Sequence, residues 1–327
     1  MIVVWKITER CNLACKFCGY DRDLSRPRLE ADPAMVSAFG AILAEYQLQT
    51  GDPVLVSWLG GEPLLWRPLS ELTRTYCTEY HLSVSTTTNG TSLASPVMRA
   101  HLLEYYSELT VSIDAMGRLH DCLRGWPGGY AALQQNVTAL AQEKQAANRG
   151  PVLRANLLLM RETLSCFEPL CRELASWGVE EVTFNQLGGN DRPEFYPDHR
   201  LSSLQADWLA RELPGLQSRL ARVGMRVHGG EEYLKRICAT ARGHRIPVAD
   251  CKPGQHFLFI GERGLMAPCS FTTGGYGVPL EEINSVDALT QLPERYSRAR
   301  QKRRLPSCAD CHSTQLFEKF AKYTYAS

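Results

Sequence analysis

The stretch Cys11-Asn-Leu-Ala-Cys15-Lys-Phe-Cys18 directly follows a short apolar run, residues 2–7. Its cysteines are separated by three and two residues, so all of them lie on one tight loop. Three thiolates on such a loop can ligate three irons of a [4Fe–4S] cluster and leave the fourth iron open for chemistry. A zinc site or a disulfide is the alternative interpretation. Zinc usually takes four ligands in two spaced pairs, and no His or Cys follows the loop before Cys77.

Short apolar runs alternate with helical patterns through the first half of the chain. The runs predict strands at 2–7, 53–59, 81–88, 108–113, 152–160 and 182–186, and helices at 68–79, 130–143 and 167–177. A further helix is expected to begin at Pro33, because Asp32 is a good N-cap and proline suits the first helical position. Strands alternating with helices predict a parallel sheet. Six units are too few for a closed eight-stranded barrel, so we expect an α/β fold, a partial (β/α)6 barrel.

The turn Gly60-Gly61-Glu62-Pro63 follows the second predicted strand. Glycines allow backbone carbonyls to approach an ammonium group, and Glu62 adds a complementary charge. In parallel α/β folds, binding sites gather at the carboxyl ends of the strands. The turn therefore predicts a ligand site beside the cysteine loop.

The cysteine loop, with the aromatic Phe17 before its third cysteine, resembles the signature of the radical S-adenosylmethionine (radical SAM) superfamily. The resemblance implies a [4Fe–4S] cluster on Cys11, Cys15 and Cys18 whose open iron binds S-adenosylmethionine. Reductive cleavage would then yield a 5′-deoxyadenosyl radical that removes hydrogen from a substrate. The Gly60–Pro63 turn resembles the superfamily's segment for the methionyl amino group.

Further binding residues are implied by the same resemblance. Thr88, Asn89, Ser112 and Asp114 would meet the ribose hydroxyls and the methionyl carboxylate. His120-Asp121-Cys122-Leu123-Arg124-Gly125 resembles a segment of the peptide- and sugar-modifying branches, and Arg124 would pair with the carboxylate. Four residues of the last two strands are expected at the same mouth: Arg154, Asn156, Asn185 and Gln186. Cys122 is a candidate hydrogen-atom donor, which would give epimerisation.

A second group of cysteines lies late in the chain, at Cys251, Cys269, Cys308 and Cys311. Four cysteines can ligate a whole [4Fe–4S] cluster, and their spacing is also compatible with zinc. The order Cys251, Gly264, Cys269 resembles the first half of the SPASM domain that follows many radical SAM barrels. Because no cysteine follows Cys311, the resemblance is to the shortened twitch version with one auxiliary [4Fe–4S] cluster. That cluster would transfer electrons or be purely structural.

The composition is that of a globular protein: 44% hydrophobic residues, 22% charged residues and a net charge of +1 over 327 residues. This charge gives no argument for nucleic acid or membrane, so we expect neither as a partner. No basic-then-apolar leader precedes the first strand, so we expect a cytoplasmic protein. Most of the twelve cysteines should then be metal ligands or buried thiols. The basic run Arg295–Arg304 is a solvated helix face or a dock for a flavodoxin- or ferredoxin-type electron donor.

Three regions are expected: the barrel at 1–190, a linker with helices at 191–245, and the auxiliary-cluster domain at 246–327, with a terminal helix near 313–323. The polar segment 188–201, where this second region begins, is interpreted as a linker or a lid. Little sequence precedes the first strand, which favours a small polar substrate such as an aminocyclitol or sugar, dehydrogenated or epimerised. Modification of a ribosomally made peptide is the alternative. A non-catalytic iron–sulfur or zinc protein is the alternative from another class.

Overall fold

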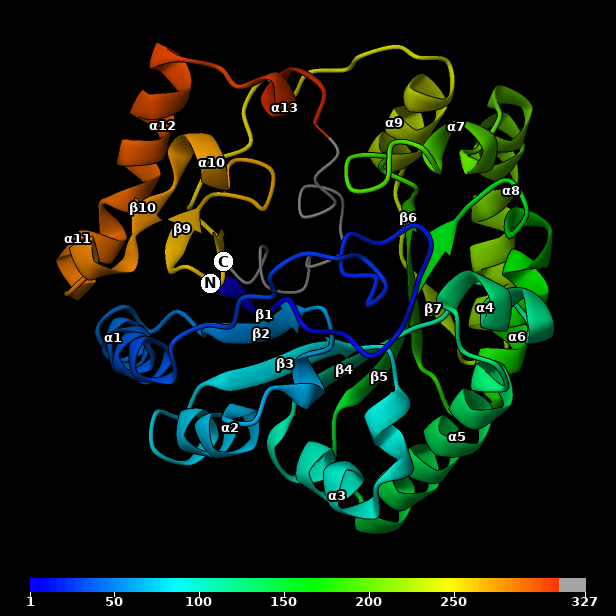
Figure 1. Ribbon diagram of the computed structural model, residues 1–327, viewed down its shortest axis with the longest axis horizontal. Helices are drawn as coiled ribbons and strands as arrows, with labels where there is room; N and C mark the ends of the chain where they lie inside the picture. The colour runs from blue at the N-terminus through cyan, green and yellow to red at the C-terminus, as the bar shows by residue number, and fades with distance from the viewer. Residues whose placement is uncertain (312–327) are drawn as a thin grey trace.

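The computed structural model describes residues 1–311. Its central feature is a run of neighbouring parallel strands in chain order: β1 (Ile2–Thr8), β2 (Leu55–Gly60), β3 (Ser83–Thr88), β4 (Glu108–Ser112), β5 (Val152–Leu159), β6 (Glu181–Gln186) and the short β7 (Arg226–Val227). The sheet curves into an open arc (Figure 1). The six predicted strands and the partial barrel are therefore confirmed.

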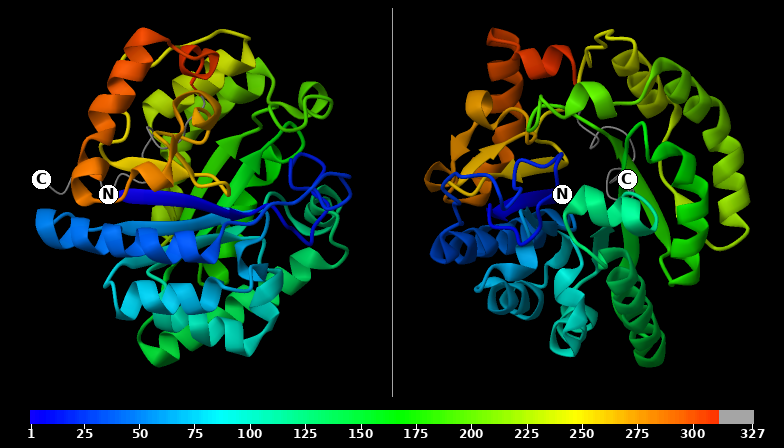
Figure 2. Two further views of the ribbon diagram at one scale, coloured as in Figure 1. Left: turned by 60° about the vertical axis from the view of Figure 1, so that its left-hand side comes forward. Right: turned by 45° about the vertical axis from the view of Figure 1, so that its right-hand side comes forward.

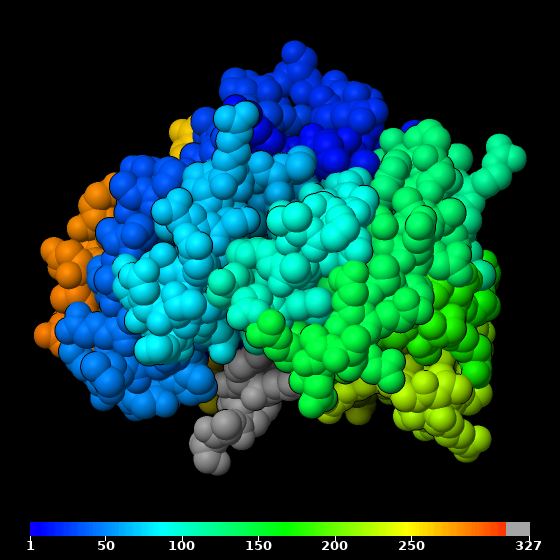
Figure 3. Space-filling view, turned by 90° about the horizontal axis from the view of Figure 1, so that it is seen from below, coloured from blue at the N-terminus to red at the C-terminus, as the bar shows by residue number. Residues whose placement is uncertain are grey.

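Helices cover the outer face of this arc (Figures 1 and 3). They are α1 (Pro33–Thr50), α2 (Leu69–Thr78), α3 (Pro96–Tyr105), α5 (Gly129–Ala147), α6 (Phe167–Ser176) and α8 (Ser203–Ala221). The predicted start of α1 is confirmed, because the Asp32 side chain accepts a hydrogen bond from the Ala34 amide at 2.9 Å. The sequence did not predict α3, whose short apolar pattern is weak.

Side chains along each strand point alternately to the two faces of the sheet, and those of β1 belong to two separate apolar cores. Val3, Trp5 and Ile7 of β1 belong to the main core beneath the helices, where the Trp5 ring lies 5.8 Å from that of Phe39. The intervening residues point into the barrel, where Ile2 and Val4 join a separate apolar cluster with Leu55 and Phe259. The barrel interior is thus apolar along β1, β2 and their neighbour β8 (Phe257–Ile260).

The late part of the chain joins the same sheet. β8 pairs with β1 in parallel, on the edge opposite β2. Antiparallel β9 (Leu265–Ala267) and β10 (Val278–Pro279) then extend a sheet of ten strands. The chain reaches β8 from α9 (Glu231–Ala241) by crossing between the two ends of the arc (Figures 1 and 2). The sheet is continuous across the expected domain boundaries at 190 and 246, which stay predictions.

Several short elements surround the mouth and the late strands. They are α4 (Gly117–Arg124), α7 (Tyr196–His199), α10 (Thr273–Tyr276), α11 (Val286–Thr290), α12 (Leu292–Lys302), α13 (Pro306–Ala309) and the 3-10 turns η1 (Pro63–Leu65), η2 (Thr91–Ala94), η3 (Leu164–Cys166) and η4 (Leu280–Glu282). The helix expected near 313–323 lies outside the described residues. Within those residues, no helix is long and apolar enough to cross a membrane.

Candidate active site

The cysteine loop leaves the carboxyl end of β1 and lies against the carboxyl end of α4. The Lys16 amide donates to the Leu123 carbonyl at 3.3 Å. Two cysteine sulfurs accept backbone hydrogen bonds, Cys11 from Leu13 at 3.5 Å and Cys18 from Tyr20 at 3.3 Å. Such N–H···S bonds favour thiolates as metal ligands.

Cys15 is the buried member of the three, with 6% of its surface exposed. Burial raises the pKa of its thiol to about 12. A thiolate at this position therefore needs a positive partner such as iron, and metal binding would release the proton.

The Gly60-Gly61 pair brings β2 into close contact with the residues that lead into the loop. The Gly61 and Glu62 amides donate to the carbonyls of Thr8 and Arg10 at 2.9 and 2.8 Å. A Cβ atom at Gly61 would lie 2.3 Å from the Arg10 carbonyl oxygen. The glycines are therefore required for backbone packing, a reason that the sequence analysis did not give.

Glu62 is fully buried and joins the ends of β2 and β3. Its carboxylate accepts from the Thr88 hydroxyl at 2.8 Å and from the amides of Leu64 and Asn89 at 3.1 and 2.6 Å. Burial raises the pKa of this carboxyl to about 7, against the effect of these hydrogen bonds. Glu62 and Thr88 thus support the turn from within the protein.

Asn89 connects the end of β3 to the cysteine loop. Its Nδ2 donates to the Asn12 side chain at 2.9 Å and lies 3.7 Å from the Cys11 sulfur. Its Oδ1 accepts from the Thr91 amide at 2.9 Å. The structure therefore brings the predicted Asn89 next to the first cysteine.

Asp114 and Arg124 form a buried ion pair beside the loop. The Arg124 Nε donates to Asp114 Oδ2 at 2.8 Å, and Asp114 Oδ1 accepts from the Leu158 amide at 3.0 Å. Among residues 1–311, the two Nη groups of Arg124 have no hydrogen-bond partner. The guanidinium carbon lies 5.5 Å from the centre of the Phe17 ring. Asp114 thus holds a guanidinium whose outer N–H groups remain available to a ligand carboxylate.

The α4 segment is itself tied to Asp114 through His120, which is fully buried. The Asp114 amide donates to His120 Nδ1 at 3.4 Å. Burial, assisted by the Arg124 charge, lowers the pKa of His120 to about 4. The imidazole is therefore neutral and acts as an acceptor that orients the end of β4.

Uncharged polar side chains line the barrel interior along β4 to β6. The Asn156 Oδ1 accepts from Thr183 Oγ1 and Asn185 Nδ2, each at 3.0 Å. Ser112 is paired with Asn156 in the register of β4 and β5. Ser112, Asn156 and Asn185 lie in the carboxyl halves of their strands, whereas Thr183 lies in the amino half of β6.

Two residues expected at this mouth lie elsewhere. Arg154 is near the amino end of β5, where it forms buried ion pairs with Glu108 at 2.9 Å and Glu181 at 2.7 Å. Gln186 donates to the Thr240 hydroxyl of α9 at 3.3 Å, away from the barrel interior. The expectation failed because register within a strand decides both the depth and the face of a side chain.

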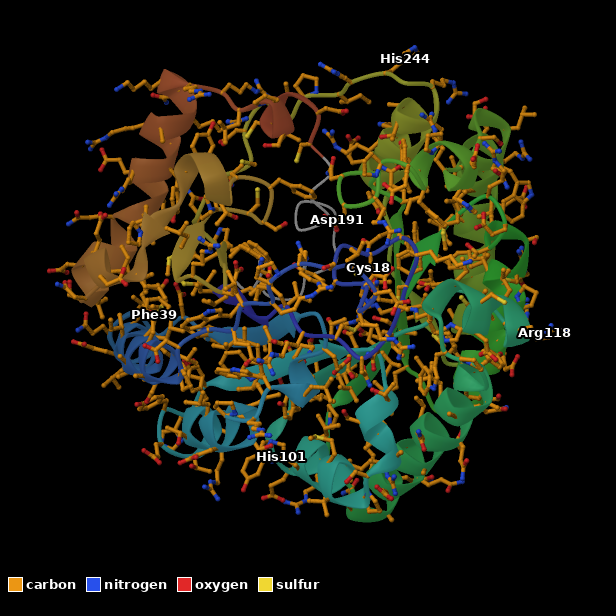
Figure 4. All side chains as sticks on the ribbon, in the orientation of Figure 1. Cys18, Phe39, His101, Arg118, Asp191 and His244 are labelled. Atoms are coloured by element: carbon orange, nitrogen blue, oxygen red, sulfur yellow. The ribbon has the colours of Figure 1, made fainter. Side chains whose placement is uncertain are left out.

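The polar segment 188–201 lies against the cysteine loop. Arg192 pairs with Asp21 at 3.0 Å, and the rings of Phe17 and Phe195 are 6.4 Å apart. Asp191 lies next to the loop beside Cys18 (Figure 4), and an added Cβ at Gly19 would be 3.2 Å from it. No local sequence pattern predicted this contact, because Asp21 and Arg192 are 171 residues apart in the chain.

Cys122 is exposed on α4, whereas its neighbours Leu123 and Arg124 are buried. It therefore lies on the solvent side of the helix. Its role as a hydrogen-atom donor stays a prediction.

The four late cysteines line one cavity of about 470 Å³, counted out to its mouth, between residues 248–253, the segment 268–276, α12 and α13. Backbone contacts hold the segments that carry them. Arg304 donates to the Cys308 carbonyl at 3.1 Å, and Arg236 donates to the Cys311 carbonyl at 2.9 Å. Burial raises the pKa of Cys269 to about 11, so here too a bound metal would have to stabilise the thiolates.

Both cysteine sets suit clusters better than single ions. A zinc ion needs its ligand atoms within about 2.3 Å of one point. In residues 1–311, no group of three or more His, Cys, Asp or Glu side chains converges in this way. The four late cysteines line one cavity and the first three lie on one short loop, and such thiolate sets are the usual ligands of iron–sulfur clusters.

Comparisons with known proteins agree with this geometry. The model of the Radical SAM superfamily matches residues 5–174. The chain is 26% identical to an AdoMet-dependent heme synthase of Methanosarcina barkeri over 83% of this chain and 76% of that protein. It is 29% identical to the mycofactocin maturase MftC of Mycobacterium tuberculosis over 82% of this chain and 64% of that protein.

Among solved structures, Streptococcus suis SuiB bound to its precursor peptide SuiA matches with a TM-score of 0.68 and 16% identity. The match covers 95% of this chain and 69% of SuiB. It confirms the expected fold class, including the region beyond the barrel. The chain belongs to the radical SAM superfamily.

Proposed function

We propose that the protein removes a hydrogen atom from an organic substrate in the barrel and then oxidises the substrate radical by one electron. The superfamily's [4Fe–4S] cluster and S-adenosylmethionine supply the 5′-deoxyadenosyl radical. The observation that supports the proposal is the second cavity, which four cysteines from three segments of the chain line together.

Cys11, Cys15 and Cys18 would hold the first cluster. Gly60, Gly61 and Pro63 would present backbone carbonyls to the methionyl ammonium, while the buried Glu62 fixes their turn through its contacts to Thr88 and Asn89. Arg124, oriented by Asp114, would bind the methionyl carboxylate together with Ser112.

Cys251, Cys269, Cys308 and Cys311 would hold the auxiliary [4Fe–4S] cluster. Full ligation by four thiolates leaves no iron free for substrate. This arrangement supports electron transfer as the role of that cluster, with a flavodoxin- or ferredoxin-type protein exchanging electrons with the enzyme.

The interior favours a substrate with an uncharged polar region. Asn156, Thr183 and Asn185 offer hydrogen-bonding groups along one wall, and the apolar cluster around Val4 and Phe259 forms the other. The interior carboxylates Glu108 and Glu181 share Arg154, and Glu181 also lies 3.9 Å from Arg226 and 3.1 Å from His228. This argues against a strongly cationic substrate held deep in the barrel. A hydroxyl-bearing metabolite such as a sugar or cyclitol, dehydrogenated at a carbinol carbon, fits these walls.

A peptide substrate is the second candidate. It is favoured by the similarity to the maturase MftC along 82% of this chain. A peptide also presents both uncharged amides and apolar side chains to the two walls.

The test is deuterium transfer into 5′-deoxyadenosine. The reconstituted enzyme, reductant and S-adenosylmethionine are incubated with deuterated cyclitols, deuterated peptides and a deuterated porphyrin, the last because of the heme synthase relatives. Transfer from a cyclitol or sugar supports the first candidate, and transfer from a peptide or porphyrin reverses the choice. Cys15→Ala should abolish 5′-deoxyadenosine release, and full activity of this variant would contradict the whole proposal.

A further inference from the structure

Arg300 of α12 is the charged side chain among the described residues that line the four-cysteine cavity. It belongs to the basic run that the sequence analysis interpreted as a solvated face or a dock. The structure divides this run. Arg295 and Arg298 pair with Glu282 and Glu294, whereas Arg300 turns toward the cysteines.

The guanidinium of Arg300 is anchored at one end and free at the other. Its Nη2 donates to the Val248 carbonyl at 2.6 Å. Its Nε is buried and has no hydrogen-bond partner within residues 1–311. A buried N–H without a partner costs on the order of 1–3 kcal/mol, so an acceptor inside the cavity would be favourable.

No carboxylate of the described residues forms an ion pair with Arg300. Within residues 1–311 its charge is therefore not cancelled by an ion pair. The guanidinium thus favours negative charge on the cysteine sulfurs.

We propose that Arg300 is a positioning residue that raises the reduction potential of the auxiliary cluster, by holding an uncompensated guanidinium and a free N–H against its ligands. The inference rests on the proposed function. Reduction adds one negative charge to the cluster, and a nearby cation stabilises that charge. Hydrogen bonds to cluster sulfurs are one of the established influences on potential.

The consequence for the reaction is a better electron acceptor. After hydrogen removal, the carbinol radical loses one electron to the cluster and its O–H proton to solvent, and a C=O bond forms. The electron then leaves to the flavodoxin- or ferredoxin-type partner. One electron enters with the cleavage of S-adenosylmethionine and one leaves here, so the cycle balances.

Arg300 variants should keep the cavity assembled, because a neighbour holds the same segment. Arg304 donates to the Val248 carbonyl at 2.8 Å and to the Cys308 carbonyl at 3.1 Å. Loss of Arg300 therefore leaves Val248 bonded. A change in the reduction potential of an Arg300 variant can therefore be distinguished from loss of the site's structure.

The test compares Arg300→Gln and Arg300→Lys with Arg298→Gln. The control removes the same charge from an exposed position of the same helix. Full-length reconstituted enzyme is titrated electrochemically, and the auxiliary cluster is followed by its paramagnetic resonance signal. A matched preparation with Cys11, Cys15 and Cys18 replaced by Ala assigns that signal.

Arg300→Gln should make reduction about tenfold less favourable, which is a potential about 59 mV lower for a one-electron couple. Arg300→Lys should fall between this and the wild type, since it keeps the charge and loses the fixed Nε–H. Arg298→Gln should shift less than Arg300→Gln, because solvent screens an exposed charge.

An Arg300→Gln shift no larger than that of Arg298→Gln overturns the inference and leaves the proposed function intact. If Arg300→Gln loses the second cluster, the inference is tested on Arg300→Lys instead. A reduction potential of the auxiliary cluster equal to that of the wild type in Arg300→Lys then overturns the inference. A wild-type preparation with about four irons and no second signal overturns the proposed function itself.

Discussion

The two cysteine sites are built in different ways. The first takes its three cysteines from eight consecutive residues and is fixed by the ends of β2, β3 and β4, which meet at one edge of the sheet. The second gathers four cysteines from three segments between Cys251 and Cys311. Arginine side chains hold those segments by their carbonyls.

This difference predicts different weaknesses. The first site depends on close backbone contact, so added volume should damage it. The second depends on ligands and charges brought from far apart, so its loss should leave the first site working.

The largest expected effect comes from Gly61→Ala. The added Cβ would lie 2.3 Å from the Arg10 carbonyl and displace the cysteine loop. We expect iron to fall from roughly eight to roughly four per chain, and 5′-deoxyadenosine release to fall at least about 100-fold because the reacting groups are misplaced.

Gly215→Ala is the matched control for this substitution. Its Cβ would meet only the terminal nitrogen Nη1 of the Arg219 side chain, at 3.2 Å, and no backbone atom. Wild-type iron content in Gly61→Ala would contradict the packing argument.

Replacing Cys308 and Cys311 together by Ala should break the second site alone. About half of the roughly eight irons should be lost. Cleavage of S-adenosylmethionine should continue, because the first site shares no ligand with the second, whereas formation of oxidised product should stop. Product formation at the wild-type rate would show that the second cluster is structural.

Glu62→Gln tests the first site through the pH dependence of the free energy of unfolding. The pKa of Glu62 is about 7 in the folded chain and about 4.3 in an unfolded one. The proton on Glu62 thus stabilises the fold fully below about pH 4.3, and this contribution is lost as pH rises through 7.

The wild type should therefore lose on the order of 3 kcal/mol of unfolding free energy relative to Glu62→Gln between pH 4 and pH 8. Urea denaturation of both proteins at several pH values measures this difference. Parallel pH curves for the two proteins would mean that folding does not raise the pKa of Glu62.

The smallest effect is expected from Cys122→Ser. The thiol is exposed on α4, and exposed substitutions change most properties by about twofold or less. Product formation and its hydrogen isotope content should therefore stay within that range. A solvent-derived hydrogen that is present in the wild-type product and absent from the Cys122→Ser product would instead support Cys122 as a hydrogen-atom donor.

Local sequence was sufficient to predict whatever depends on neighbouring residues. The cysteine loop, the Gly60–Pro63 turn, the capped start of α1 and the six parallel strands all follow from short patterns. Contacts between distant segments did not follow. Asp21 and Arg192 are far apart in the chain. In the sequence, Arg300 is one of several arginines in a basic run, and only the position of α12 in the structure distinguishes it from the others. Arg154 was misplaced because a strand pattern does not tell how deep in the barrel a residue lies.

The pairing of β1 with both β2 and β8 has a consequence for synthesis of the protein. β1 is made before β8, so one of its edges stays unpaired until the late strands leave the ribosome. At about 5–20 residues per second, this interval is on the order of 10–50 s. An unpaired strand edge invites contact with other chains. The nascent barrel therefore has a long period in which the free edge of β1 needs protection.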